Sequence, residues 1–387
     1  MKHLERRNFI KLSSMGALVP AFGTSTLADS RQVGNGLIAP SQVNFISDGL
    51  PLSPMEYSQL LSKLTEKEGI EEDYYSLNGC VEELENKFAQ LLGKESAVFM
   101  PTGTLANHLA IRALAGKNNR VILQHESHVY NDTGDGVQTL SNLNLIPLGM
   151  DKATFTVDEV NEVLKRTASG RVAGKVGVIS IESPVRRKTG EMFDYEQMKQ
   201  ISQLAKTNDI KMHLDGARLF LASGYTGIAP KAYASLFDTV YVSLYKYFNA
   251  ASGAILAGPK ELIAPMYHTR RMFGGGLHQV WPFAAVALHY LDGFVERYTK
   301  AVGVSEELIK RLTNQGGVEI QRIPNGSNIF KMNVKDISAN VFAENLKKNG
   351  IIARPGVGNS LNLLVNESLL TSHIGALEAG FVNSLKK

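Results

Sequence analysis

Two short stretches, His213-Leu-Asp215-Gly-Ala-Arg218 and Tyr241-Val-Ser-Leu-Tyr-Lys246, decide the fold of this chain of 387 residues. Each contains or directly follows a short apolar run, which is typical of a buried strand. The two runs therefore predict two successive strands that end at Asp215 and Lys246.

Apolar runs of the same kind alternate with helical patterns through the first two thirds of the chain. Strands are predicted at residues 97–100, 120–123, 176–181, 211–214, 239–244 and 254–256, and helices between them at 105–114 and 194–207. This alternation predicts an α/β fold with a mostly parallel sheet flanked by helices. Ligands of such sheets gather at the carboxyl ends of the strands, where Asp215 and Lys246 fall.

The pattern changes after about residue 261. A helix-rich stretch covers residues 283–312, and a helix at 339–348 separates β-like segments at 328–334 and 361–365. The sequence thus predicts a smaller C-terminal α+β domain. We divide the chain into a signal segment, a linker, a large domain and a small domain at residues 1–28, 29–43, 44–261 and 262–387.

An aspartate and a lysine at successive strand ends are the two groups that pyridoxal phosphate (PLP) requires. The amine of Lys246 would form a Schiff base with the cofactor, and the carboxylate of Asp215 would keep its pyridine nitrogen protonated. A desolvated lysine loses its charge readily, which suits attack on a carbonyl. Singly, each residue reads as a strand-end cap or a solvated charge. Their order and spacing, with the segment 101–104, favour the cofactor.

The segment Pro101-Thr-Gly-Thr104 lies between a predicted strand and a predicted helix. Gly103 lets the backbone approach a ligand, and Thr104 offers a hydroxyl beside the free N–H groups of the helix. This setting favours an anion such as a phosphate. By itself the motif also fits an ordinary capped turn.

His128 follows the next predicted strand, in the loop His125-Glu-Ser-His128-Val-Tyr130. Its flat ring is suited to stacking on the cofactor. The alternative is a metal site formed by His125, Glu126 and His128. Those ligands would all lie on one short loop with no convergent partner, so we predict no metal.

The formal net charge of +4 comes mostly from residues 1–28, which carry four basic residues against one glutamate. The rest of the chain has no basic stripe, so we expect no nucleic-acid partner. Cys80 is the single cysteine, which excludes an intrachain disulfide. No activating pattern surrounds it, so a catalytic Cys80 is not expected.

The first residues include Arg6-Arg7-Asn-Phe-Ile-Lys11, which resembles a twin-arginine export signal. The weakly apolar stretch 12–27 that follows is too short and polar to anchor in a bilayer, and residues 26–28 offer a cleavage site. We predict export to the periplasm without a membrane anchor. The alternative is an N-terminal helix of a cytoplasmic protein.

On these motifs, the chain resembles the low-specificity L-threonine aldolase and aromatic amino acid β-eliminating lyase family of fold-type-I PLP enzymes. The likeness runs from residue 44 to the C-terminus. The matching stretches are residues 47–48, 92–104, the His128 loop, 213–220, 243–246 and 271–276.

The resemblance implies catalytic roles for four residues. Lys246 would carry the cofactor and shuttle a proton, and Asp215 would pair with the pyridine nitrogen. Arg218 would lie near the phenolic oxygen of the cofactor, and His128 would stack over its ring.

The resemblance also implies how the ligands and subunits are held. Gly103 and Thr104 would bind the phosphate together with Ser243, and Ser47 would help to hold an amino acid substrate. The family forms homodimers that pair into homotetramers, and residues 271–276 would serve a neighbour's site.

The substrate end departs from the family pattern in three places. Val185 replaces a histidine that contacts the substrate hydroxyl, and Asn362 replaces the arginine that clamps the α-carboxylate. Tyr245 replaces the usual serine before the lysine. Asparagine cannot replace a bidentate charged clamp, so the substrate half of the site is expected to be rebuilt.

Arg186, Arg187 and Arg354 lie close in sequence to the lost positions. Arg186 and Arg354 are therefore our candidate substrate residues, although all three also read as surface cations.

We predict a PLP-dependent carbon–carbon lyase that cleaves a β-hydroxy amino acid to glycine and an aldehyde, or eliminates a β-substituent. The alternatives are an aminotransferase, a racemase, or an exported, catalytically inactive homologue that acts as a binding protein.

Overall fold

The computed structural model describes residues 32–33, 37–38, 42–172 and 174–386. The predicted signal segment, residues 1–28, lies outside these residues, and so does most of the predicted linker. Among the described residues, no helix combines the length and apolar character needed to cross a membrane.

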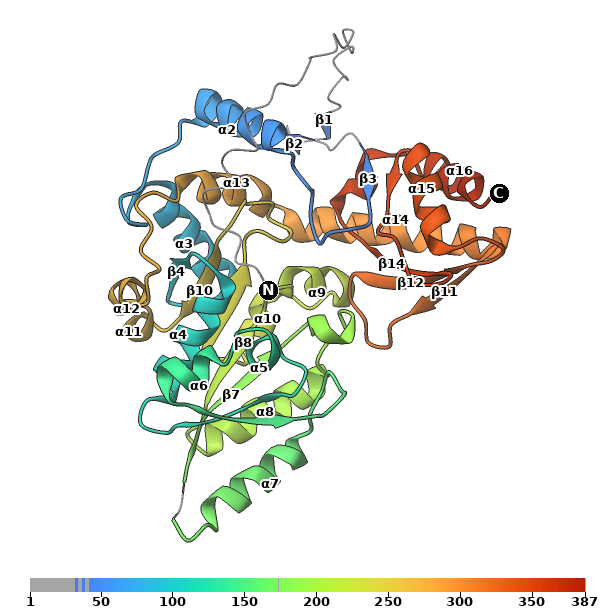
Figure 1. The fold of residues 1–387 in the computed structure, drawn as a ribbon. Coiled ribbons are helices and arrows are strands. Elements are labelled where there is room, and N and C mark those ends of the chain that lie inside the picture. Colours follow the sequence, from blue (N-terminus) through green and yellow to red (C-terminus); the bar gives the residue numbers. More distant parts are fainter. Residues whose placement is uncertain (1–31, 34–36, 39–41, 173, 387) are drawn as a thin grey trace, which may run out of the picture. The chain divides into compact units, whose positions relative to one another are not determined.

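The main sheet has seven strands in the order β4-β10-β9-β8-β7-β5-β6 (Figure 1), and most of the predicted site residues lie at the ends of these strands or just after them. The last five strands in this order run parallel, and β10 is antiparallel to both of its neighbours. The bounds are β4 Ser96–Met100, β5 Arg120–Gln124, β6 Asn144–Leu148, β7 Val176–Glu182, β8 Lys211–Asp215, β9 Thr239–Ser243 and β10 Ala254–Gly258. This sheet confirms the predicted α/β fold.

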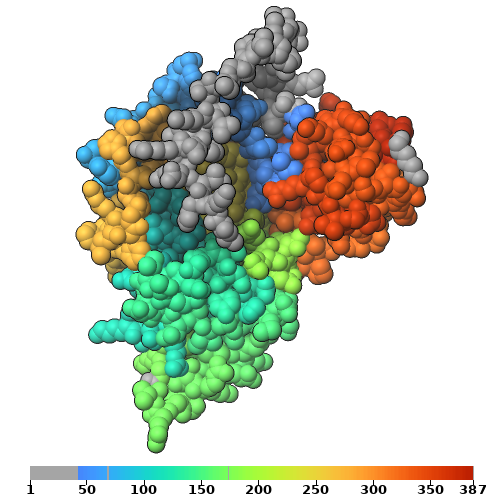
Figure 2. All heavy atoms as spheres, in the orientation of Figure 1, coloured from blue at the N-terminus to red at the C-terminus, as the bar shows by residue number. Residues whose placement is uncertain are grey.

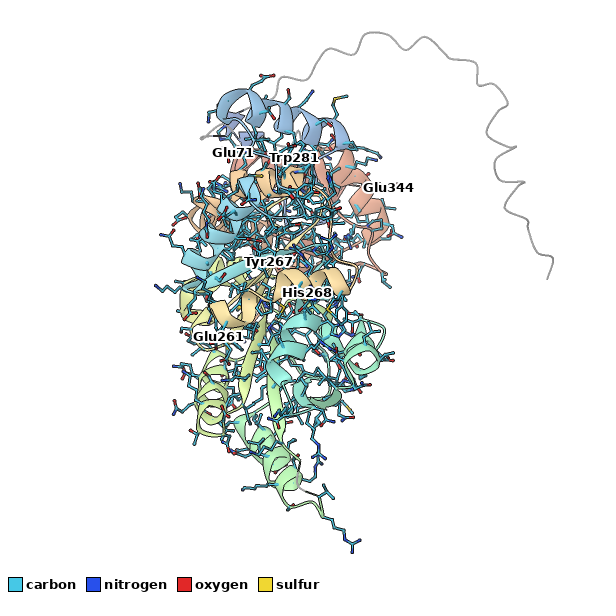
Figure 3. The ribbon with its side chains drawn as sticks, turned by 90° about the vertical axis from the view of Figure 1, so that its left-hand side faces the viewer. Glu71, Glu261, Tyr267, His268, Trp281 and Glu344 are labelled. Atoms are coloured by element: carbon cyan, nitrogen blue, oxygen red, sulfur yellow. The ribbon has the colours of Figure 1, made fainter. Side chains whose placement is uncertain are left out.

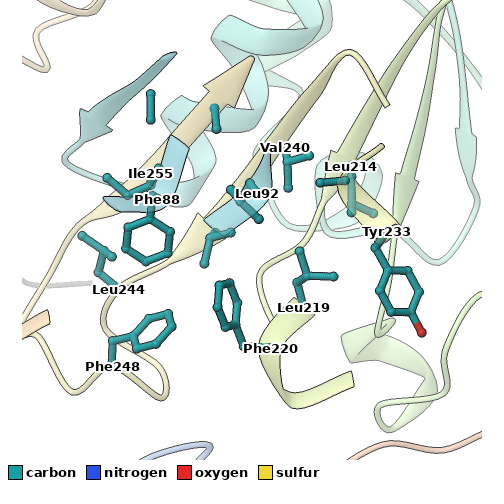
Figure 4. Packing of buried hydrophobic residues seen from close by; sticks show 14 of the residues in the cluster. Phe88, Leu92, Leu214, Leu219, Phe220, Tyr233, Val240, Leu244, Phe248 and Ile255 are labelled. Atoms are coloured by element: carbon teal, nitrogen blue, oxygen red, sulfur yellow. The ribbon is translucent and has the colours of Figure 1, made fainter. Parts of the chain in front are cut away.

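Helices cover the sheet because their apolar residues fall on one face. In α3, Val81, Leu84, Phe88 and Leu92 recur every three or four residues, and all four are fully buried. Figure 4 shows Phe88 against Phe220, whose ring centroids lie 6.0 Å apart in an edge-on contact. The helices of this part are α2 Pro54–Glu68, α3 Gly79–Leu92, α4 Gly103–Ala115, α5 His128–Asn131, α6 Gly136–Ser141, α7 Val157–Ala168, α8 Tyr195–Thr207, α9 Leu219–Thr226, α10 Pro230–Ala234, α11 Lys260–Ile263, α12 Met266–Met272 and α13 Trp281–Leu291, with the short 3₁₀ helix η1 Arg186–Lys188.

The C-terminal part has its own antiparallel sheet in the order β11-β12-β14. In β12, buried Phe330, Met332 and Val334 alternate with more exposed residues, as expected for a strand with one covered face. Figures 1 and 2 show the elements from β11 onward gathered in orange and red. The elements are α14 Phe294–Gln315, β11 Val318–Arg322, β12 Ile329–Val334, α15 Ala339–Lys348, β13 Ile351–Ile352, β14 Ser360–Leu364, η2 Glu367–Thr371 and α16 Ile374–Ser384.

Two segments exchange places between the large-sheet part and the C-terminal part: one near the start of the described chain packs in the C-terminal core, and one after residue 262 packs in the core of the large sheet. Strand β3 (Val43–Asn44) pairs in parallel with β13, and Phe45 is buried in the C-terminal core. Conversely, α13 and the start of α14, through Tyr298, belong to the core of the large sheet. The domain division at residues 261 and 262 stays a prediction. Strands β1 (Gln32–Val33) and β2 (Leu37–Ile38) pair with each other in a separate two-stranded sheet.

The structure differs from the predicted element pattern at several elements, of which β6 and the stretch 283–312 are two. Strand β6 was not predicted, because Asn144 and Pro147 interrupt its apolar pattern at the edge of the sheet. The helix-rich stretch 283–312 is divided between α13 and α14 at Gly293, whose φ of 67° lies in the left-handed region that ends a helix.

Helix α12 is tied to the first part of the sheet through a buried carboxyl group. Tyr267, labelled in Figure 3, donates a hydrogen bond to Oε2 of Glu85 (2.6 Å), and Oε1 of Glu85 accepts one from the Phe99 amide (2.7 Å). Burial raises the pKa of Glu85 to about 7. The helix is followed by the glycine loop 274–276, whose predicted role at a neighbour's site stays a prediction.

Candidate active site

A cleft of about 720 Å³ opens at the carboxyl ends of the parallel strands. Its wall comes from the segments that follow β4, β5, β7, β8 and β9, from residues 46–48, and from the C-terminal part. Nine predicted site residues line it: Ser47, Gly103, Thr104, His128, Arg186, Asp215, Arg218, Lys246 and Arg354.

Ser243 is the predicted site residue that does not line the cleft. Its short side chain is fully buried in β9. The predicted role of Ser243 beside a phosphate group stays a prediction.

Lys246 lies in the turn after β9 and is half-buried. Its predicted role as the cofactor lysine stays a prediction. Its Nζ donates a hydrogen bond to Oη of Tyr245 (3.2 Å) and lies 4.5 Å from the centre of that ring. Tyr245, which replaces the serine of the family pattern, also lines the cleft.

Asp215, at the end of β8, is 2% exposed and is oriented by a buried chain of hydrogen bonds. Asn107 of α4 donates from Nδ2 to Oδ2 of Asp215 (2.6 Å), and its Oδ1 lies 2.9 Å from Nε2 of His213. The Oγ1 of Thr239 lies 2.8 Å from Nδ1 of His213. Burial lowers the pKa of His213 to about 3, so this ring is neutral at physiological pH. A neutral ring that donates from Nε2 and accepts at Nδ1 satisfies both neighbours.

Sequence reasoning missed Asn107, although it lies on the helix that follows the predicted phosphate motif. We expect Asn107→Leu to lower the free energy of unfolding by about 1–3 kcal/mol, because it leaves the buried Asp215 and His213 without a shared partner. Denaturant unfolding measures this change. Asn161→Leu, a substitution at a half-buried position of α7, is the matched control. Equal unfolding free energies for the two variants would contradict the proposed tie.

The N-terminus of α4 forms a cradle after β4. The hydroxyl of Thr102 caps the helix by accepting from the Leu105 amide (3.2 Å). A Cβ on Gly103 would lie 2.0 Å from Oη of Tyr241, so only glycine fits at this position. Among the described residues, the N–H groups of Gly103 and Thr104 have no acceptor, and together with the Thr104 hydroxyl they are suited to phosphate.

His128 begins α5 and is held from three directions. Its backbone N–H donates to Oε2 of Glu182 (2.5 Å), Nδ1 lies 3.4 Å from Oδ2 of Asp132, and Nε2 lies 3.4 Å from Oγ1 of Thr104. Burial raises the pKa of Glu182, with the neighbouring charge of Asp215 adding to the effect. In the part of the chain that the structure describes, no group of three or more His, Cys, Asp or Glu side chains is placed to hold a metal ion.

Arg218 is bound by one carboxylate oxygen of Asp48, with Nε and Nη2 each 2.9 Å from Oδ2. Asn328 of the C-terminal part donates to the other carboxylate oxygen of Asp48 (2.9 Å). Burial alone would raise the pKa of Asp48, but Arg218 outweighs it and holds that pKa below its ordinary value. This contact joins three distant segments beside Ser47, whose Oγ donates to the Gly49 carbonyl (2.7 Å).

The positions at which the sequence departs from the expected family pattern lie in different surroundings. Val185 is fully buried and does not line the cleft. Asn362 is exposed on β14 and also does not line it. Arg186 and Arg354 both do, whereas Arg187 points into an ion pair with Asp132 (3.2 Å).

The sequence profile of the family described as "Beta-eliminating lyase" matches residues 62–335, which is well over half of the chain. The chain belongs to the β-eliminating lyase family. Lyases of this family depend on PLP, so this match confirms the predicted family, enzyme class and cofactor.

Solved structures of the same family share the fold. A candidate aromatic amino acid β-eliminating lyase/threonine aldolase from Exiguobacterium sp. 255-15 has a TM-score of 0.74 and 24% identity, and covers 89% of this chain and 97% of its own. A candidate L-allo-threonine aldolase from Listeria monocytogenes EGD-E has a TM-score of 0.73 and 25% identity, and covers 89% and 96%.

Among curated relatives, the low-specificity L-threonine aldolase of Candida albicans is 32% identical over 212 residues. The alignment covers 54% of this chain and 56% of that protein, so the chain matches little more than half the length of this relative.

The residues present fit the cofactor of the family. Lys246 offers an amine, and Asp215 offers a carboxylate fixed by Asn107 at the same cleft. The α4 cradle, where a Cβ has no room, offers the phosphate site.

Proposed function

We propose that this protein is a lyase of the threonine-aldolase type that cleaves a β-hydroxy α-amino acid to glycine and an aldehyde. The observation that carries the proposal is the joint placement of Lys246, Asp215 and the α4 cradle around one cleft. That cleft also receives Ser47 and Arg354, which are suited to an amino acid's carboxylate.

PLP, when bound, supplies an electron sink for the bond that breaks at the α-carbon. The side chain of Lys246 would hold the cofactor and then carry a proton at the α-carbon. The carboxylate of Asp215 would keep the pyridine nitrogen protonated, and Arg218, oriented by Asp48, would lie beside the cofactor's phenolic oxygen. Nε2 of His128, oriented through Asp132, is our candidate acceptor of the β-hydroxyl proton.

We propose that Arg354 replaces the missing carboxylate clamp at Asn362. It follows β13, and β13 pairs with β3 just before Ser47, so backbone pairing brings the two residues to one cleft. Arg354→Gln should raise KM about 10- to 100-fold with a smaller change in kcat, because a charge-assisted bond to the ground-state substrate is lost. Steady-state kinetics measure this split. Arg171→Gln, remote from the cleft lining, is the control, and an unchanged KM in Arg354→Gln would exclude the clamp.

Glycine and aldehyde formation from L-allo-threonine and L-threonine tests the proposed reaction in the holoenzyme. Release of glycine with an equimolar aldehyde is the expected result. Release of a keto acid and ammonia from a β-substituted amino acid, without glycine from either substrate, would instead establish elimination. Absence of both reactions in a PLP-loaded enzyme would overturn the proposal.

We also propose export through the twin-arginine route, supported by the Arg6-Arg7 motif. Substitution of both arginines by lysine should keep the protein in the cytoplasm in a cell-fractionation experiment.

The predicted homodimer or homotetramer remains a proposal, and sedimentation measurements of the purified holoenzyme would test it.

A further inference from the structure

Two arginines in the cleft wall donate no guanidinium hydrogen bond to the part of the chain that the structure describes. Arg354 makes neither a hydrogen bond nor an ion pair there. Arg186 has one ion pair, with Asp132 at 3.6 Å, and 61% of its side chain is exposed. Both are therefore available to anionic groups of a ligand.

The carboxylates that line the same cleft already have partners. Asp48 is bound by Arg218 and Asn328, and Asp215 accepts from Asn107. The two oxygens of Glu182 accept the backbone N–H groups of His128 and Arg186. Because the chain's own anions are paired, a ligand anion is the natural partner of a guanidinium that faces the cleft.

The neighbouring Arg187, in contrast to Arg186, is engaged by carboxylates of the chain. Arg187 Nη1 donates to Asp132 at 3.2 Å, and its Nε lies 3.7 Å from Glu126. Asp132 is thus drawn mainly to Arg187 and holds Arg186 by the longer contact. The preceding residue, Val185, is fully buried, so Arg186 is the first side chain of this loop to face the cleft.

The two available arginines come from different elements. Arg354 comes from the C-terminal part near Ser47, where we place the α-carboxylate, whereas Arg186 follows β7 beside His128. The phosphate of the cofactor has its own site at the α4 cradle. One α-carboxylate and one phosphate therefore leave Arg186 without an assigned anion.

We propose that the substrate carries a further anionic group on its side chain, a carboxylate or a phosphate, and that Arg186 binds it. This proposal rests on the lyase function proposed above. In the cleavage, the Cα–Cβ bond breaks, and the hydroxyl proton passes to a base of the chain as Cβ becomes a carbonyl. The electron pair of the broken bond stays with Cα, which takes up a proton. The products are glycine and an aldehyde that keeps the anionic group.

Kinetics of the holoenzyme with matched substrates test the proposal. We expect kcat/KM for L-β-hydroxyaspartate or for the phosphate ester of 4-hydroxy-L-threonine to exceed that for L-allo-threonine at least tenfold. The comparison between the two anionic substrates identifies which anion is bound. Arg186→Gln should lower the preference for the anionic substrate at least tenfold, because an amide cannot replace a guanidinium. Arg171→Gln, at a position that does not line the cleft, should change it less than threefold.

A binding measurement separates this proposal from the lyase reaction. L-aspartate, which has no β-hydroxyl group to cleave, should bind the wild-type holoenzyme at least tenfold more tightly than L-alanine in titration calorimetry, and Arg186→Gln should abolish the difference. If L-aspartate behaves in this way but no β-hydroxy amino acid is cleaved, the reaction is wrong and the anion site stands. Equal binding of L-aspartate and L-alanine would overturn the anion site. The anion site would also be overturned if Arg186→Gln weakened PLP binding and lowered kcat/KM equally for the anionic substrate and for L-allo-threonine. Arg186 would then serve the cofactor.

Discussion

Lys246→Ala is expected to lower kcat by at least about 10⁴-fold. The variant loses both the amine that would hold the cofactor and the group that would move a proton at the α-carbon, and general acid–base catalysis alone contributes about 10²–10⁴-fold. No other lysine lines the cleft among the described residues, so a substitute amine at the right place is not available. Glycine release from L-allo-threonine or the preferred anionic substrate measures this loss.

The cofactor attachment gives a second readout of the same variant. After borohydride reduction, peptide mass spectrometry should find the cofactor on residue 246 of the wild type and on no peptide of Lys246→Ala. Lys199→Ala, at an exposed position in α8, should keep both attachment and activity. Normal activity in Lys246→Ala would refute the assignment of this residue.

Asp215→Asn is expected to lower kcat on the order of 10³-fold with little change in overall fold. The amide keeps the size of the carboxylate but removes the charge that supports a protonated pyridine nitrogen, and loss of one preorganised electrostatic contact costs about 10²–10³-fold. The effect is strengthened here because Asp215 is 2% exposed. Water therefore screens its charge only weakly, and the interaction that the substitution removes is strong. Turnover and the absorption spectrum of the bound cofactor measure the change.

The surroundings of Asp215 make the comparison with Asp215→Glu informative. Asn107 fixes the carboxylate at 2.6 Å, and the Ala217 amide donates to its other oxygen at 3.2 Å. Glutamate keeps the charge but moves it by one methylene, so it should recover part of the activity lost in Asp215→Asn. If Asp215→Asn were fully active while retaining PLP, the carboxylate would have only a structural role.

The cofactor half of the site was predictable from the sequence because its residues lie in local motifs. The apolar strand before Asp215, the strand before Lys246, and the strand and helix around Gly103 each have a short-range pattern. Parallel strands place their carboxyl ends at one edge, so these motifs meet without any detailed knowledge of packing. The same reasoning missed β6, whose polar edge position gives no such pattern.

The substrate half followed less directly from the sequence. Arg186 and Arg354 were candidates because they lie near the lost positions, but no local pattern distinguishes Arg186 from Arg187. Arg186 and Arg187 are adjacent and chemically identical, yet only Arg186 lines the cleft, whereas Arg187 makes the shorter contact with Asp132, at 3.2 Å against 3.6 Å. That choice depends on where α5 and η1 lie relative to each other. It is a property of packing and has no periodicity in the chain.

By itself, then, the sequence determined an α/β chain with Lys246 and Asp215 at neighbouring strand ends, because strand periodicity and turn chemistry act over a few residues. Only the tertiary structure decided what holds those groups in place. Asn107 reaches Asp215 across 108 positions of the chain, and Arg218 reaches Asp48 across 170. Hydrogen bonds between such distant residues form only after the helices have packed on the sheet, because burial and orientation exist only in the folded chain.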